Sequence, residues 1–134
     1  MSQNNNEISV PVSPGELVDK ITILEIKSER IEDVTKVVNV NTELQLLQGV
    51  WRDSHYPIAD VEEQHRQLKA INEELWEIED DIRIKEKAKE FDDEFVRLAR
   101  AVYVTNDRRA AVKKEINLKL GSLLVEEKSY EDYT

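Results

Sequence analysis

The segment that decides the fold is residues 68–82, LKAINEELWEIEDDI. Its aliphatic residues recur at alternating spacings of three and four, and they are Leu68, Ile71, Leu75, Ile78 and Ile82. This spacing places them on one side of an α-helix, while charged residues cover most of the remaining surface. One helix cannot bury such a stripe alone, so the rest of the chain must supply packing partners.

The composition is typical of a single helical domain. The chain has 134 residues, of which 36% are charged, and it contains only three Gly and three Pro. The absence of Cys excludes disulfides and thiolate metal sites and suits a reducing cytosol. No signal peptide or membrane-spanning apolar run is recognisable, and the net charge of −10 opposes binding to phosphate backbones. We therefore expect a cytoplasmic protein that binds neither membrane nor nucleic acid.

The chain divides into three parts by composition and periodicity. Residues 1–12 are expected to form a disordered or extended lead-in, and residues 13–125 a single helical domain. Residues 126–134 form an acidic C-terminal tail, whose acidic part is expected to be mobile, whereas the apolar residues just before it should dock.

Local signals predict where the helices of the domain begin and end. Ser13 and Glu16 have the spacing of a capping box, which predicts a first helix from Pro14. A second helical segment is expected over residues 34–51, with a kink or break between Asp33 and Asn41 because asparagines are poor helix formers.

Two long helices follow the loop at residues 53–57. The third is expected from about residue 60, and the fourth from Asp92 to Leu120, where Gly121 would end it in a left-handed conformation. The polar residues 85–90 are expected to hold the turn between them. The sequence therefore predicts an all-α helical bundle of three to four helices, built on a long antiparallel helical hairpin.

Polar residues interrupt the apolar stripes of both hairpin helices. If the turn is centred between residues 87 and 88, these interruptions fall at one level of the bundle and predict a polar layer of His65, Asn72, Asn106, Asp107 and one or both of Arg108 and Arg109. A buried polar layer of this kind can be structural and fix the register and oligomeric state. It can also line a small-ligand pocket between the third and fourth helices, and the sequence leaves both alternatives open.

Two tryptophans are candidates for an interface. Trp76 follows directly after Leu75 and so lies away from the centre of the stripe, where the first helix or a second copy of the chain would have to cover it. Together with Trp51, Ile84 and residues 123–125, it gives more apolar surface than one hairpin can cover. This surplus predicts a homo-oligomer or a protein partner.

An acidic pattern resembles the Mg²⁺ site of the all-α MazG-type nucleoside-triphosphate pyrophosphohydrolases. Its residues are Glu73, Glu74, Glu77, Glu90 and Asp93. In that family, carboxylates on neighbouring helices hold the metal that binds the triphosphate and activates water. The chain has 29 acidic residues, so such spacings arise by chance, and the glutamates point largely outward. We expect no cofactor and no metal site, and keep Mg²⁺ as the alternative.

Four further stretches together resemble a family of short bacterial and phage helical proteins catalogued only as a domain of unknown function. The stretches are SPGELVDKITILEIK at residues 13–27, LWEIED at 75–80, LARAVY with NDR within 98–108, and EEKSY at 126–130. The resemblance extends from residue 11 to residue 133. It implies a helical domain and supplies no activity, cofactor or catalytic residue.

The leading functional hypothesis is a non-enzymatic interaction or assembly module. Nothing predicts nucleophilic catalysis, since the chain has two His, no Cys and no glycine-rich phosphate loop. The alternatives are a Mg²⁺-dependent pyrophosphohydrolase-like enzyme and a small-ligand binder that uses the polar layer.

Overall fold

The computed structural model describes residues 6–133, which contain four α-helices and no strand. They are α1 (Pro14–Arg30), α2 (Val34–Ser54), α3 (Glu62–Ala88) and α4 (Asp93–Lys119), and a short 3₁₀ helix, η1 (Ile58–Val61), precedes α3. The prediction of an all-α bundle is confirmed. No helix in this described part of the chain is both long and apolar enough to cross a bilayer.

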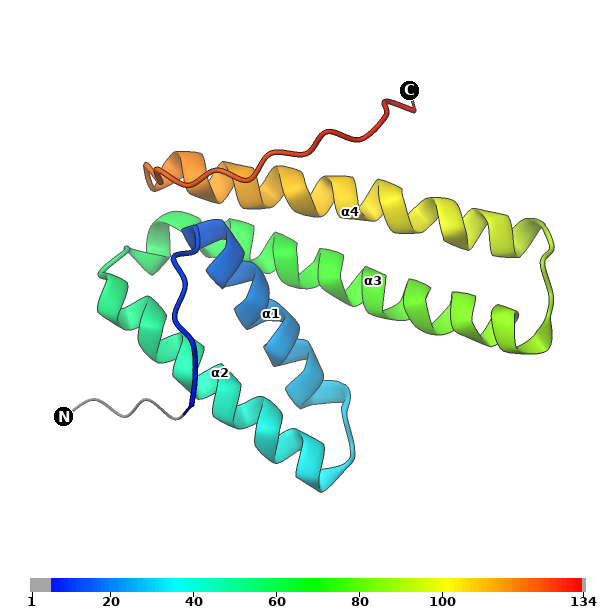
Figure 1. Cartoon of the computed structure of the whole chain (residues 1–134), viewed down its shortest axis with the longest axis horizontal. Coiled ribbons are helices and arrows are strands. Elements are labelled where there is room, and N and C mark those ends of the chain that lie inside the picture. The colour runs from blue at the N-terminus through cyan, green and yellow to red at the C-terminus, as the bar shows by residue number, and fades with distance from the viewer. Residues whose placement is uncertain (1–5, 134) are drawn as a thin grey trace.

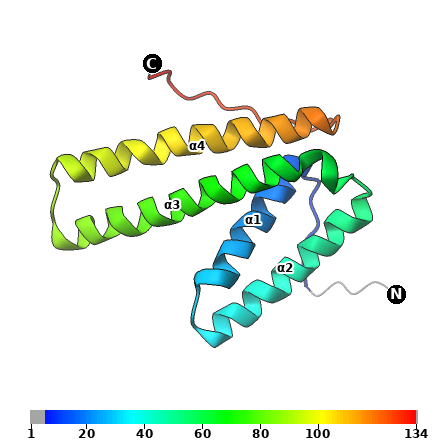
Figure 2. The same cartoon turned by 180° about the vertical axis from the view of Figure 1, so that it is seen from behind.

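The helices form two antiparallel hairpins of unequal length. α3 and α4 make the long hairpin, and α1 and α2 make the shorter one, which diverges from it (Figure 1). α1 packs on both α3 and α4, whereas the backbone of α2 comes close only to that of α1. Seen from either side, the turn end of the α3–α4 hairpin extends beyond α1 without a third helix (Figure 2).

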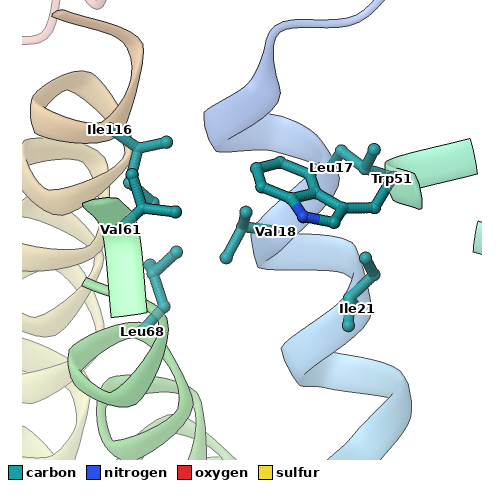
Figure 3. Packing of buried hydrophobic residues seen from close by; sticks show 7 residues of the cluster. All are labelled: Leu17, Val18, Ile21, Trp51, Val61, Leu68 and Ile116. Atoms are coloured by element: carbon teal, nitrogen blue, oxygen red, sulfur yellow. The ribbon is translucent and has the colours of Figure 1, made fainter. Parts of the chain in front are cut away.

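The hydrophobic core lies where all the helices meet, at the end of the long hairpin remote from its turn. Its buried members are Leu17, Val18, Ile21, Trp51, Val61, Leu68 and Ile116 (Figure 3). The apolar residues of the stripe at 68–82 are therefore buried to different extents. Leu68 and Ile71 are buried beside α1, whereas Leu75, Ile78 and Ile82, nearer the turn, are only half-buried.

The start of α1 follows the predicted cap in part. The Ser13 hydroxyl accepts a hydrogen bond from the Glu16 N–H at 3.2 Å, with Pro14 in the first helical position. The Glu16 carboxylate, however, accepts from Lys113 Nζ at 2.6 Å on α4. The break after α1 lies at Asp33, which caps α2, and both Asn39 and Asn41 lie inside a continuous helix.

The turn between α3 and α4 falls later than predicted. The helical propensity of residues 85–88 prevails, so α3 continues to Ala88 and Lys89 takes the left-handed conformation (φ 58°). Asp92 then caps α4 by accepting from the Phe95 N–H at 3.0 Å. The register predicted from a turn centred between residues 87 and 88 is therefore wrong, and Arg108 lies opposite Glu74 at 2.8 Å.

The C-terminal segment folds back along α4 (Figure 1). Gly121 (φ 66°) reverses the chain as predicted. Ion pairs then join Glu126 to Lys113 at 3.5 Å and Glu127 to Lys114 at 3.7 Å. The expected docking of the apolar residues is wrong for Leu123, which is fully exposed, because the acidic residues that follow it make the contacts with α4.

Candidate functional site

A buried polar cluster joins α1 to the long hairpin, and Asp19 lies at its centre. The Asp19 side chain faces α3 and α4 and is 0% exposed. Its carboxylate accepts from the Arg109 guanidinium through both oxygens, with 2.9 Å between Nε and Oδ1. It also accepts from Asn72 Nδ2 at 2.9 Å. The hydrogen bond to Asp19 raises the pKa of the Arg109 guanidinium above its usual range.

Further contacts complete this polar cluster. Asn72 Nδ2 also donates to Thr22 Oγ1 at 3.0 Å, and Lys113 Nζ lies 3.8 Å from Asp19 and 2.6 Å from Glu16. Two cations thus face two carboxylates in a mostly buried setting, which satisfies the requirement that charges taken out of water be paired and hydrogen-bonded. The cluster holds three helices in one register.

The first turn of α1 approaches α4 unusually closely. The Gly15 N–H donates to Asn117 Oδ1 at 2.7 Å. A Cβ at Gly15 would lie 2.4 Å from the backbone oxygen of Lys113, a distance that real Cβ atoms do not adopt. The contact therefore requires glycine, because any side chain would force the two helices apart.

The predicted polar layer is assembled only in part. Asn72 and Arg109 belong to the polar cluster, and Asn106 lies beside them, with its Oδ1 3.4 Å from Arg109 NH1. His65 instead forms a separate pair with Glu25 of α1 at 3.0 Å.

Asp107 and Arg108 do not join the polar cluster, so the placement of Asp107 in the layer was wrong, and of the two arginines only Arg109 belongs to it. Both are exposed: Arg108 pairs with Glu74, and Asp107 accepts a hydrogen bond from Tyr133 that raises the pKa of that phenol. Successive residues of a helix point about 100° apart. Asp107 and Arg108 therefore point away from the side of α4 on which Arg109 faces α1.

Asp19 and Lys113, which sequence reasoning missed, carry much of the polar cluster. Asp19 lies between Leu17 and Ile21 in a strongly helical stretch, where a charged residue ordinarily indicates a solvated face. Lys113 is explained equally well by the C-terminal end of the α4 dipole. The one indication in the sequence was the number of polar residues on the apolar stripe of α4, which implied that a helix packed on it carries an opposite charge.

The two tryptophans have different surroundings. Trp51 is 8% exposed and packs in the core, with its ring 5.9 Å from that of Tyr56, so it is not an interface residue. Its position on the inner side of α2 explains this burial. Trp76 is half-buried, and the guanidinium of Arg30 at the end of α1 lies 5.9 Å from its ring centre. The expected contact between Trp76 and the first helix is confirmed.

The carboxylates of the pyrophosphohydrolase-like pattern are dispersed. Arg30 lies 4.0 Å from Glu73 and 3.8 Å from Glu77, while Lys85 lies 3.1 Å from Glu90 at the turn. Glu74 faces Arg108 on another side of α3, and Asp93 begins α4 beyond the turn. Within residues 6–133, no three His, Cys, Asp or Glu side chains are placed to hold a metal ion together. The geometry gives this alternative no support.

An open groove begins where α1 leaves the long hairpin. A cavity of about 410 Å³ lies between Ile23 and Ile26 of α1 and Leu75, Trp76 and Arg83 of α3. Toward the turn, helical spacing continues the same side of the hairpin into further apolar residues. We define the open groove by Leu75, Trp76, Ile82, Phe91, Phe95 and Val102; all are half-buried except Phe91, which is 56% exposed.

The comparisons with known proteins concern nearly the whole chain. The model of a family of unknown function (DUF6165) matches residues 8–133. No significant match was found among curated proteins or among solved structures.

Proposed function

This chain belongs to DUF6165, a family of unknown function, and we propose that it is a non-enzymatic assembly module that docks a second copy of itself along the open groove. The observation that carries this proposal is the unequal cover of the long hairpin. α1 packs on the half remote from the turn, whereas the half near the turn consists of two helices alone.

Two packed helices bury only the seam between them. Ile78, Ile82 and Phe95 lie in this seam and remain half-buried, and Phe91 is mostly exposed. A third or fourth helix along the open groove would remove this apolar surface from water, which is the main favourable contribution to association. Two such hairpins, each covering the other, would form a four-helix bundle.

The charge pattern of α3 favours a second copy over an unrelated helix. Residues 73–81 contain six acidic residues and no basic one, whereas residues 83–89 contain four basic residues and one acidic residue. Two α3 helices related by a two-fold axis run antiparallel, so the acidic half of each would face the basic half of the other. Two α3 helices that met in a parallel orientation would instead place like charges opposite each other.

One residue pair gives this arrangement a specific register. Asp80 and Lys87 are exposed on the side of α3 that also carries Trp76 and Arg83, which is one flank of the open groove, and neither forms an ion pair within residues 6–133. A two-fold axis near Arg83 would bring Asp80 of each copy to Lys87 of the other and Trp76 toward the exposed Phe91. These four residues are the expected centre of the contact.

The expected association is reversible, because the open groove offers a small interface. A stretch of about 15 helical residues is only about 22 Å long, which places the contact at the low end of specific interfaces. We expect a dissociation constant on the order of 10 µM, weakened by added salt because exposed charges steer the contact.

Sedimentation equilibrium of wild type and charge-swapped chains tests the proposal. Wild type should change from monomer to dimer between about 1 µM and 1 mM, and Asp80→Lys should shift this transition to at least about tenfold higher concentration. The double swap Asp80→Lys with Lys87→Asp should restore dimerisation, because each reversed charge again meets its opposite. Asp53→Lys, at the exposed end of α2, makes the same charge change away from the groove and should dimerise like wild type.

Two results would contradict the proposal. One is a wild-type chain that stays monomeric up to about 1 mM, where even a weak interface of this size is populated. The other is a single swap that associates as strongly as wild type. A double swap that remains as weak as the single swap would contradict the antiparallel arrangement.

A further inference from the structure

A second cavity lies between α1, α2 and the start of α3, away from the open groove. Its volume is about 390 Å³, within the range of small-molecule sites. Four buried side chains from α1, α2 and η1 form its apolar wall, and they are Val18, Ile21, Trp51 and Val61. Figure 3 shows Trp51 flat against α1 beside Val18 and Ile21. The cavity therefore suits an apolar body of a few carbon atoms or one ring.

The polar residues that line this cavity are less buried than its apolar wall, and we place its mouth at them. On one side, His65 Nε2 lies 3.0 Å from Glu25 Oε1, so this carboxylate already has a partner. On the other side, Gln48 and Arg52 come from α2. Within residues 6–133, Arg52 forms no ion pair, although acidic residues outnumber basic ones by 29 to 19 in the whole chain.

The Arg52 guanidinium lies close to the mouth. A Cβ built on Gly49 would lie 3.6 Å from Arg52 Nη2, an ordinary contact distance, so the guanidinium folds back beside residue 49. A planar guanidinium without an ion-pair partner can take both oxygens of a carboxylate in parallel hydrogen bonds.

We propose that this cavity binds a small carboxylic acid whose apolar body, aromatic or branched aliphatic, lies against Trp51 and whose carboxylate pairs with Arg52. Gln48 supplies an amide donor to the same carboxylate. A cationic ligand is disfavoured because Glu25 is engaged by His65, and a polyphosphate is disfavoured because the mouth has one unpaired cation and the wall is apolar. This inference goes beyond the assembly role, since the cavity shares no residue with the open groove.

The two tryptophans of the chain provide an internal control for binding. The probe is 3-phenylpropionate, and its neutral counterpart is 3-phenylpropan-1-ol. In ¹H–¹⁵N spectra, the indole N–H signal of Trp51 should move saturably with the acid, while the signal of Trp76, assigned with the Trp76→Phe variant, should stay in place. The alcohol should bind about tenfold more weakly, because it lacks the charge-assisted hydrogen bonds.

A matched pair of arginine variants tests the proposed role of Arg52. Arg52→Gln should weaken binding of the acid about tenfold and leave binding of the alcohol unchanged. Arg66→Gln removes the same charge from an exposed residue of α3 that does not line the cavity, and should bind the acid like wild type. Neither residue belongs to the open groove, so the dimerisation measured by sedimentation is independent of this result.

Three outcomes would overturn the inference. The first is the absence of a saturable Trp51 shift with either probe. The second is equal shifts of Trp51 and Trp76, which indicate non-specific binding. The third is unchanged affinity for the acid in Arg52→Gln, or an alcohol that binds wild type as tightly as the acid.

Discussion

The two halves of the α3–α4 hairpin contain the same kind of apolar stripe and have different surroundings. Near the core, α1 lies across the hairpin, Leu68 and Ile71 are buried, and the polar cluster around Asp19 fixes the register. Near the turn, Leu75, Ile78 and Ile82 continue the stripe without a third helix. Burial is thus decided by the supply of packing partners, because the periodicity of α3 does not change between the halves.

The halves also differ in how their charges contribute. In the polar cluster, Asp19 is inaccessible to water, and its loss would leave Arg109 without its main partner and Lys113 without a second carboxylate. At the turn, the ion pairs of Lys85 with Glu90 and Asp92 are exposed. Exposed pairs contribute little to stability, whereas breaking a buried one is costly. Four experiments test this contrast and the contacts behind it.

Replacing the central carboxylate should have the largest effect. Asp19→Asn keeps the shape of the side chain but leaves the half-buried Arg109 without its carboxylate partner, so we expect a loss of about 3–5 kcal/mol in the free energy of unfolding. Urea denaturation followed by circular dichroism measures it. Glu74→Gln breaks the exposed pair with Arg108 and should cost less than about 1 kcal/mol. Equal losses in the two variants would refute the contrast.

Truncation of one aliphatic residue in each half compares their packing directly. Leu68→Ala removes a fully buried side chain and should cost about 3 kcal/mol, whereas Ile82→Ala removes a half-buried one and should cost about 1 kcal/mol in the monomer. Urea denaturation at low protein concentration, where the chain is monomeric, gives both values. A loss at Ile82 as large as that at Leu68 would show that the turn half is as well packed as the core half.

Two glycines should respond to alanine with opposite sign. Gly15→Ala places a methyl group 2.4 Å from a backbone oxygen of α4 and should destabilise by about 1–3 kcal/mol. Gly49→Ala lies in α2, where the nearest atom is 3.6 Å away at the end of a flexible arginine, and should stabilise by about 0.5–1 kcal/mol. Thermal unfolding of the two variants distinguishes the cost of a steric clash between α1 and α4 from the gain that comes from reducing the backbone entropy of the unfolded chain. Stabilisation by both variants would show that α1 can move away from α4 at little cost.

The Lys85–Asp92 contact at the turn should make the smallest contribution to stability, and this contribution should depend on pH. Lys85 lowers the pKa of Asp92 through a hydrogen bond, and the Phe95 N–H contributes in the same direction. Because the folded pKa lies below the unfolded one, this stabilisation is complete above about pH 4 and is lost as the pH falls through the folded pKa. Amide exchange around the turn, corrected for its intrinsic pH dependence, should accelerate by a few-fold in that range. Asp92→Asn should abolish this dependence, and its persistence would assign the effect to another group.

Sequence reasoning predicted the elements better than their mutual arrangement. The caps at Ser13 and Asp92 and the reversal at Gly121 depend on neighbouring residues, so local patterns reveal them. The hairpin register depends on the turn at Lys89, and an error in the position of that turn shifted the predicted pairing of α3 with α4, although Asn72, Asn106 and Arg109 still come together. Asn72 and Arg109 were identified as misplaced polar residues, but their partner Asp19 was not, because a lone carboxylate on an amphipathic helix has no local sign of burial.

The position of α2 beside α1 affects the order in which the parts of the chain unfold. Since α1 is the one helix of the described residues whose backbone approaches that of α2, detachment of α1 from the long hairpin would carry α2 with it, and the two would leave as one cooperative unit. The same opening would uncover the buried half of the stripe and extend the open groove along the whole of α3. An α1 helix from another molecule could then occupy the vacated site, so this fold carries a built-in route to domain swapping that becomes accessible wherever the polar cluster around Asp19 is weakened.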